Sequence, residues 1–154
     1  HGLGIGSGMA FAAKIDSKKY NTFVLLGDGE CNEGSVWEAA MFAAHHKLEN
    51  LTAIVDRNKL CIHGTTEEIN QLEPLDKKFE SFGWHVENVD GHNINEIISK
   101  LKVNHNNKPK MIIANTIKGK GVSFMENSVK WHHGSIGKDL YNQAKIELIR
   151  NPNK

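Results

Sequence analysis

The chain has 154 residues, of which 39% are hydrophobic and 24% are charged, which is the make-up and the length expected of one globular domain. Its 19 basic and 18 acidic residues give a net charge of +1, and the basic residues do not form a stripe that could follow a nucleic-acid backbone. No apolar run approaches the ~20 residues that span a bilayer. These features argue against nucleic-acid and membrane partners.

The first residues give clues to location and completeness. They read HGLGIGSGMAFAAK and lack the basic start and long apolar stretch of a signal peptide. The two cysteines, Cys31 and Cys61, are too few for a disulfide framework and fit a reducing compartment. We therefore predict a cytoplasmic protein. Because His1 is not a methionine and a glycine-rich loop is already under way at Gly2, we also expect the chain to be truncated at its start.

Predicted helices and strands alternate along the chain. After the glycine-rich loop we expect a short helix at Met9–Lys14, then a strand at Asn21–Gly27 that is buried on both faces, because its apolar run is continuous. The further elements expected from periodicity are helices at Ser35–Leu48, Leu75–Phe82, Ile94–Val103 and Lys138–Ile149, strands at Leu51–Val55, Trp84–Val89 and Met111–Ala114, and a functional loop at Lys118–Gly137. The pattern predicts a three-layer α/β/α fold with a mostly parallel sheet, and one domain over residues 1–154.

Two short segments combine into a candidate ligand site. Gly27-Asp28-Gly29-Glu30 follows the first expected strand, and Asn58 follows the next one. Asp-Gly turns are also common structural features, so the tetrapeptide alone leaves that reading open. Neighbouring parallel strands, however, would bring Asp28 and Asn58 side by side, at the edge where such sheets bind ligands. A carboxylate, an amide oxygen and a backbone carbonyl suit Mg²⁺ or Ca²⁺ with diphosphate oxygens.

With these residues in view, the sequence resembles the thiamine-diphosphate enzymes of the transketolase family. The segment GDGECNEGSVWEAAMFAAHHKLENLTAIVDRN is similar to the family signature, in which Asn follows Gly-Asp-Gly by some thirty residues. The resemblance extends to the opening segment, to NKLCIHGTTEEI and to NTIKGKGVSFMENSVKWHHG. It is closest to the split bacterial transketolases, in which this diphosphate-binding module and the pyrimidine-binding module are separate polypeptides.

The resemblance implies roles for individual residues. The side chains of Asp28 and Asn58 and the carbonyl of Leu60 would hold a divalent cation, Mg²⁺ or Ca²⁺, that bridges to the cofactor diphosphate. Gly27, Gly29 and Glu30 would line the same site. Glu33 matches an acid near the family's dimer interface, although an acid at a helix start also interacts favourably with the helix dipole.

Two residues of the late loop complete the implied site. Lys118 in IKGKG and His132 in WHHG correspond to family residues that reach the cofactor, and we expect both to act in catalysis. A cation and an imidazole close to a diphosphate make charge-assisted hydrogen bonds. The other reading is a lysine-rich loop that is only a solvated surface. The roles of His1, His63 and His133 are left open.

The implied function is ketol transfer from a ketose phosphate to an aldose phosphate in the pentose phosphate pathway, with thiamine diphosphate as cofactor. The family's catalytic glutamate and its stacking aromatic residues belong to the pyrimidine-binding module. We therefore expect a partner subunit, an oligomer, and no activity without that partner. Two alternatives remain: a deoxyxylulose-phosphate-synthase-like enzyme and a non-catalytic truncated module. A Rossmann dehydrogenase is disfavoured, because the glycine-rich segment follows no strand and has no ribose-binding acid about twenty residues later.

Overall fold

The computed structural model of the protein describes residues 1–103 and 107–150. Its centre is a parallel sheet with the strand order β1-β2-β6-β5. The strands are β1 (Thr22–Gly27), β2 (Leu51–Arg57), β6 (Lys110–Asn115) and β5 (His85–Asp90). Gly27 pairs with Asp56, and Asn115 pairs with both Arg57 and Asp90. The carboxyl ends of all these strands therefore meet at one edge of the sheet.

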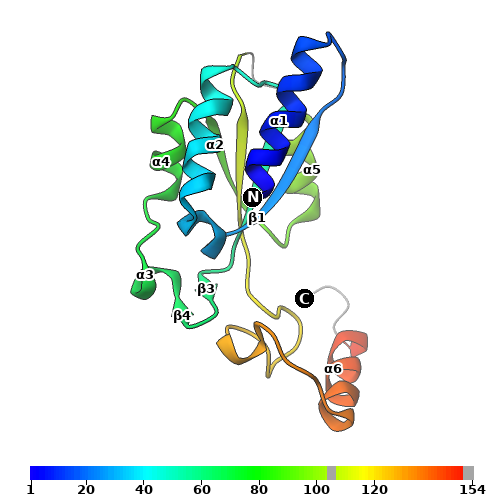
Figure 1. The fold of residues 1–154 in the computed structure, drawn as a ribbon. Coiled ribbons are helices and arrows are strands. Elements are labelled where there is room, and N and C mark those ends of the chain that lie inside the picture. The colour runs from blue at the N-terminus through cyan, green and yellow to red at the C-terminus, as the bar shows by residue number, and fades with distance from the viewer. Residues whose placement is uncertain (104–106, 151–154) are drawn as a thin grey trace.

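Helices cover the two faces of the sheet unequally (Figure 1). The larger core lies under α1 (Gly2–Ile15), α2 (Gly34–His45) and α4 (Leu75–Ser81), where Val36, Phe79 and Met111 are fully or almost fully buried. On the opposite face α5 (Ile94–Lys102) packs Ile97 and Leu101 against a smaller cluster. The predicted three-layer α/β/α fold with a parallel sheet is confirmed.

Shorter elements surround the carboxyl edge of the sheet. They are the 3₁₀ helices η1 (Gly29–Asn32) and η2 (Val129–Trp131), the hairpin β3 (Leu60–Cys61) and β4 (Gly64–Thr65), and the one-turn helix α3 (Thr66–Ile69). The last helix, α6 (Lys138–Arg150), stands away from the sheet beyond this edge (Figure 1). Within the described residues, none of the helices has the length and apolar character needed to cross a membrane.

The glycine-rich start is helical, so the predicted loop before Met9 is wrong. Gly4 and Gly8 have open space where a side chain would stand. Gly6 faces the sheet, and a Cβ there would lie 2.3 Å from Cγ2 of Val24. Tertiary packing overrides the low helix propensity of glycine here, because only a residue without a side chain lets α1 approach β1 so closely.

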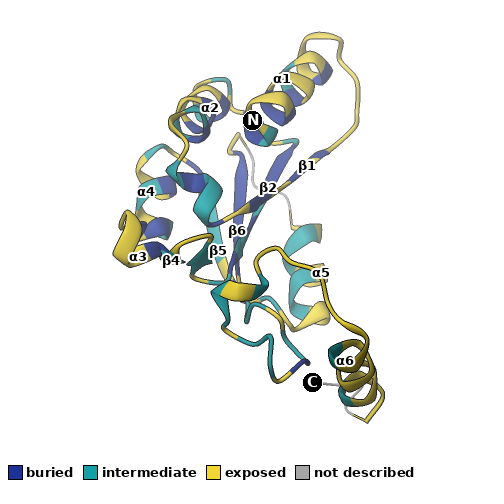
Figure 2. Cartoon of the chain, turned by 60° about the horizontal axis from the view of Figure 1, so that its bottom comes forward, coloured by how far each residue is buried: buried dark blue, intermediate teal, exposed yellow. Residues whose placement is uncertain are grey.

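Strand β1 is not buried on both faces, which corrects a second expectation. Its residues alternate between buried and exposed, and Phe23 and Leu25 are 56% and 71% exposed. The reason is its edge position in the described sheet: helices α1 and α2 cover one face, while on the other face the cluster under α5 includes residues of β5, β6 and β2 but none of β1. Figure 2 shows the alternation along β1.

Candidate functional site

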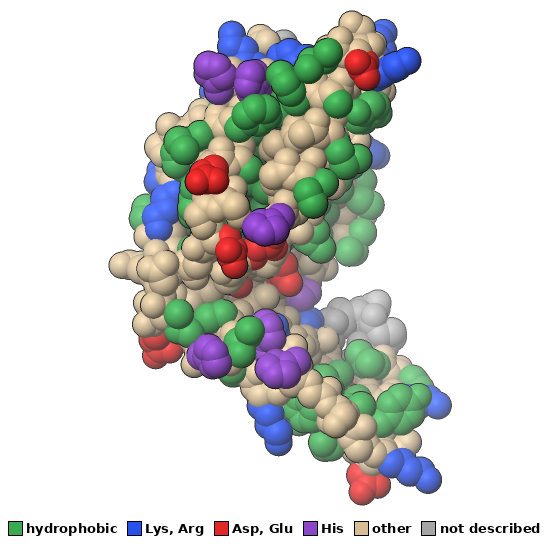
Figure 3. Space-filling model, viewed as in Figure 1, with side chains coloured by type: hydrophobic (Ala, Val, Ile, Leu, Met, Phe, Trp, Pro, Cys, Tyr) green, Lys and Arg blue, Asp and Glu red, His purple; other side chains and the backbone are tan. Residues whose placement is uncertain are grey.

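A pocket of about 580 Å³ lies at the carboxyl edge of the sheet. Figure 3 shows acidic and histidine side chains gathered where the sheet body meets the C-terminal segment. The lining residues are Gly27, Asp28, Gly29, Glu30, Asn32, Glu33, Asp56, Asn58, Leu60, Cys61, Ile62, His63, Ile69, Lys118 and His132. Every residue that the sequence predicted for the cofactor and cation site is among them. We call Asp28 and Asn58, together with Arg57, which bonds to Asp28 but does not itself line the pocket, the sheet wall of the site, and Lys118 and His132 the loop wall.

Asp28 is a buried carboxylate whose position is fixed by backbone and side-chain donors. It follows the last residue of β1 and caps η1, and it is only 2% exposed. Its Oδ1 accepts from the Gly29 N–H at 2.8 Å, and its Oδ2 accepts from the Lys59 N–H at 2.5 Å. The second bond ties the end of β1 to the loop after β2. The ends of β1 and β2 therefore lie next to each other, as the sequence predicted.

The sequence reasoning missed Arg57, which balances the charge of Asp28. Its side chain is 2% exposed, and its Nη1 donates to Asp28 Oδ2 at 3.1 Å. The guanidinium also donates to Thr66, Glu67 and Glu73, at distances between 2.8 and 3.1 Å. Burial alone would lower the pKa of Arg57, but the hydrogen bonds and charges of Glu73 and Asp28 outweigh it and raise that pKa. The sequence signal that could have indicated Arg57 is its position as a basic residue at the end of the apolar strand β2.

Asn58 lies in the tight turn that leads from β2 into the β3–β4 hairpin, and Leu60 is the first residue of β3. Lys59 between them has a φ of +67°, and the Leu60 N–H donates to Asn58 Oδ1 at 3.1 Å. An amide oxygen has two lone pairs, so this bond leaves one of them for a ligand. Among the described residues, no group of three or more His, Cys, Asp or Glu side chains could hold a metal ion. A cation here would need backbone, amide and ligand oxygens.

Glu30 and Cys31 belong to the 3₁₀ helix η1, and Glu33 follows its last residue. Glu30 Oε2 accepts from the Gly27 N–H at 3.2 Å. Glu33 is the N-cap residue of α2, but its side chain makes no capping bond and lines the pocket. Burial, with the charges of Asp28 and Glu30, raises the pKa of Cys31 to about 12. This thiol is therefore a packing group and not a nucleophile.

The loop wall brings Lys118 and His132 to the pocket from residues that follow β6. Partial desolvation by the surrounding residues lowers the pKa of His132, and the positive charge of Lys118 and the His133 ring lower it further. His132 is therefore a neutral imidazole at neutral pH, able to donate or accept a hydrogen bond. His63 also lines the pocket, whereas His1 contacts the hydroxyl of Ser35 at 3.5 Å. His133 packs edge-on against His132 and is not one of the lining residues.

The fold and the pocket define a class of protein. A parallel α/β domain with a buried carboxylate, an amide side chain and a lysine around a pocket at its carboxyl edge resembles the domains that bind phosphorylated cofactors there. Residues 2–154 match the family described as transketolase, thiamine diphosphate binding domain. The chain belongs to this family.

Curated relatives and solved structures agree with the family assignment. The chain is 48% identical over 150 residues to an apulose-4-phosphate transketolase subunit of Phocaeicola vulgatus, with 96% of this chain and 53% of that protein covered. It is 44% identical to a 6-deoxy-6-sulfo-D-fructose transketolase subunit of a Clostridium species, with 96% and 54% covered. The chain thus spans about half the length of these relatives.

The fold also matches solved transketolases. A transketolase from Campylobacter jejuni superposes with a TM-score of 0.87 at 32% identity, over 95% of this chain and 24% of that one. A transketolase from Pichia stipitis, in complex with a sedoheptulose 7-phosphate, gives a TM-score of 0.85 at 32% identity, over 99% and 25% of the two chains. The thiamine-diphosphate-binding part of a transketolase is therefore the fold that this chain adopts.

Proposed function

We propose that residues 1–154 form one domain that binds thiamine diphosphate through a divalent cation and serves ketol transfer between sugar phosphates. The observation that carries the proposal is the meeting of all the predicted site residues in one pocket. The names of the relatives support it, because both are transketolase subunits. When bound, the cofactor would supply the chemistry that carries the two-carbon unit.

The proposed cation ligands are the Asp28 and Asn58 side chains and the carbonyl of Leu60. Their hydrogen bonds in the structure fit that role. Oδ2 of Asp28 accepts two bonds, from Arg57 and Lys59, whereas its Oδ1 accepts one, from Gly29. Oδ1 therefore keeps a lone pair for a cation. An all-oxygen set of this kind suits Mg²⁺ or Ca²⁺, with the diphosphate supplying further oxygens.

The proposed role of the loop wall is to hold the anionic end of the cofactor and a phosphorylated substrate. Lys118 offers a positive charge, and His132 offers a neutral imidazole held near it. Charge-assisted hydrogen bonds from such groups are about twice as strong as neutral ones. Gly27 and Gly29 carry no side chains, which gives a ligand access to their backbone.

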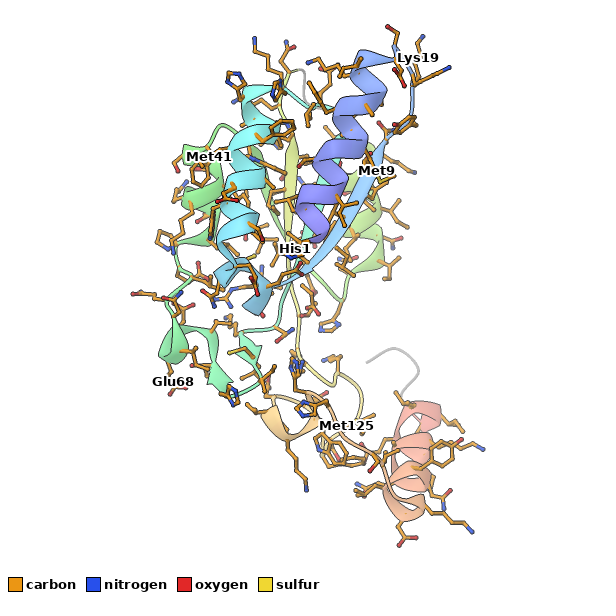
Figure 4. All side chains as sticks on the ribbon, in the orientation of Figure 1. His1, Met9, Lys19, Met41, Glu68 and Met125 are labelled. Atoms are coloured by element: carbon orange, nitrogen blue, oxygen red, sulfur yellow. The ribbon has the colours of Figure 1, made fainter. Side chains whose placement is uncertain are left out.

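The chain is proposed to work with a pyrimidine-binding partner subunit, in an oligomer. Relatives that are named as single subunits of transketolases support this arrangement. Apolar side chains on the outer faces of α1 and α2 offer contact area for such a partner: Met9 is 53% exposed and Met41 is 51% exposed (Figure 4). Without the partner, we expect binding but no ketol transfer.

Calorimetric titration of thiamine diphosphate and Mg²⁺ tests the proposal, first with the chain alone and then with its partner subunit. We expect metal-dependent binding that strengthens with the partner. Asp28→Asn keeps the shape of the side chain but removes its charge, and it should weaken binding by about 100-fold, as loss of a metal ligand does. No binding by the wild-type chain under either condition would leave only a non-catalytic relative.

A matched control separates ligand loss from damage to the buried charges. Glu67→Gln alters another partner of Arg57, but Glu67 does not line the pocket. The control should keep the affinity of the wild-type chain. Equal losses in Asp28→Asn and Glu67→Gln would mean that the buried network as a whole, and not a cation bond to Asp28, decides binding.

A further inference from the structure

A turn after β5 touches the segment that leads to Lys118. The turn consists of Gly91 and His92, which follow the last β5 residue, Asp90, and the segment consists of Thr116 and Ile117, which follow the last β6 residue, Asn115. The Gly91 N–H donates to the Asn115 carbonyl at 2.8 Å, and the Ile117 N–H donates to His92 Nε2 at 2.8 Å. The turn therefore extends the pairing of β5 with β6 beyond the last strand residues.

Gly91 shows how close this contact is. A Cβ at Gly91 would lie 2.3 Å from Cγ2 of Thr116 and 2.9 Å from the Asn115 carbonyl oxygen. Real Cβ atoms do not approach backbone atoms so closely, so only glycine allows the turn to pack here. The His92 N–H in turn donates to Asp90 Oδ1 at 2.9 Å, which fixes the backbone from which the imidazole extends.

The segment is held from the β2 side as well. The Thr116 hydroxyl donates to the Asp56 carboxylate, and the Thr116 N–H donates to the Arg57 carbonyl at 3.1 Å. Thr116 is thus bonded to the end of β2, and Ile117, the residue before Lys118, is bonded to the turn after β5. Asp56 and Lys118 both line the cofactor pocket.

Beyond Lys118 the loop closes on itself. The Lys118 carbonyl accepts from the Asn127 N–H at 2.9 Å, and Gly119, with a φ of +74°, packs against Met125 (Figure 4). The side-chain bond from His92 therefore acts at the point where this closed loop joins the sheet. A shift at that point would move the Lys118 side chain relative to the cation ligands.

We propose that His92 is a positioning residue whose neutral imidazole accepts the Ile117 N–H and so fixes Lys118 over the cofactor pocket. A backbone N–H can only donate, so Nε2 must be the unprotonated nitrogen and the ring proton must lie on Nδ1. The consequence for cofactor binding rests on the function proposed above. The anchoring of the loop by His92 is independent of that function.

Two substitutions separate the hydrogen bond from mere space filling. His92→Gln places an acceptor oxygen near the position of Nε2, whereas His92→Leu fills a similar volume without an acceptor. Amide exchange of Ile117 reports the bond directly in the full chain, with no cofactor present. We expect exchange about tenfold faster in the leucine variant, and near the wild-type rate in the glutamine variant.

Calorimetry with thiamine diphosphate and Mg²⁺ then tests the link to Lys118. The leucine variant should bind about tenfold more weakly, and the glutamine variant should recover most of the affinity. An unchanged exchange rate of the Ile117 amide in His92→Leu, or an equal loss of cofactor affinity in both variants, would overturn the positioning role. If the wild-type chain binds no cofactor, but the Ile117 amide still exchanges faster in His92→Leu than in His92→Gln, the proposed function fails and the anchoring of the loop stands.

Discussion

The two walls of the pocket are held in different ways. In the sheet wall, Asp28 and Arg57 are each 2% exposed and bond to each other across two strand ends. In the loop wall, Lys118 is half-buried and His132 is exposed, and the loop between them is closed mainly by its own bonds, such as Lys118 to Asn127. Buried, fully bonded groups keep their geometry before a ligand arrives, whereas exposed loops have lower local stability. We expect the sheet wall to be preorganised and the loop wall to adjust.

Breaking the sheet wall should have the largest effect. Arg57→Met leaves Asp28 buried without a counter-charge, which typically costs about 3–5 kcal/mol of unfolding free energy. Urea unfolding followed by circular dichroism measures the loss. The control is Lys77→Met, which removes an exposed ion pair between Lys77 Nζ and Glu80 Oε2, 2.7 Å apart. It should change the unfolding free energy by no more than about 0.5 kcal/mol. A small effect of Arg57→Met would mean that the buried ion pair does not hold the sheet wall.

Breaking the loop wall should act locally. Gly119 has a φ of +74°, and a Cβ there would lie 2.5 Å from the Met125 carbonyl oxygen. Gly119→Ala should therefore cost about 1–2 kcal/mol, mostly in the loop. Amide exchange should rise for residues 118–127 and stay unchanged in β2 and β6. The matched control is Gly8→Ala, an open helical position, which should raise stability by roughly 0.5–1 kcal/mol.

Acid titration probes the sheet wall through Glu73, a partner of Arg57. Burial alone would raise its pKa, but the Leu75 N–H and the Arg57 guanidinium outweigh burial and lower the pKa below the ordinary 4.5. The folded state therefore binds the proton more weakly than the unfolded state does. Glu73 contributes stability above pH 4.5 that is lost as the pH falls through its folded pKa. In Glu73→Gln the unfolding free energy should fall less steeply below that pH; equal slopes would contradict this.

The smallest expected effect is on the ionisation of His132. Partial desolvation and the charge of Lys118 lower its pKa, so Lys118→Met should raise that pKa towards the ordinary value. NMR titration of the imidazole in the absence of cofactor measures the change. Lys120→Met is the matched control, because Lys120 does not line the pocket. A His132 pKa that responds equally to both substitutions would mean that Lys118 is not held near the ring.

The alternation of helices and strands could be predicted because apolar periodicity records which faces are buried. The meeting of Asp28 and Asn58 could be predicted because parallel strand ends share an edge, and Lys118 and His132 were found through family resemblance. Other features depend on partners distant in sequence. The helical start follows from how closely Gly6 approaches Val24, and the exposure of Leu25 follows from strand order.

Arg57 shows a different limit of prediction from the sequence. Arg57 is buried because Asp28, Glu67 and Glu73 converge on it from separate segments, and its place at the end of an apolar strand does not by itself identify these partners. His92 is similar: its role depends on a single backbone donor, Ile117, that lies 25 residues away. Periodicity describes faces of elements, but not such pairwise bonds across strand ends.

The burial of Cys31 has a practical consequence. The chain has two cysteines, and Cys31, with its pKa of about 12, holds almost no thiolate at neutral pH. Cys61 is half-buried and lines the pocket. A maleimide fluorophore should therefore attach selectively at Cys61 without any cysteine having to be removed. The chain thus comes with a natural labelling position for an optical sensor of cofactor capture.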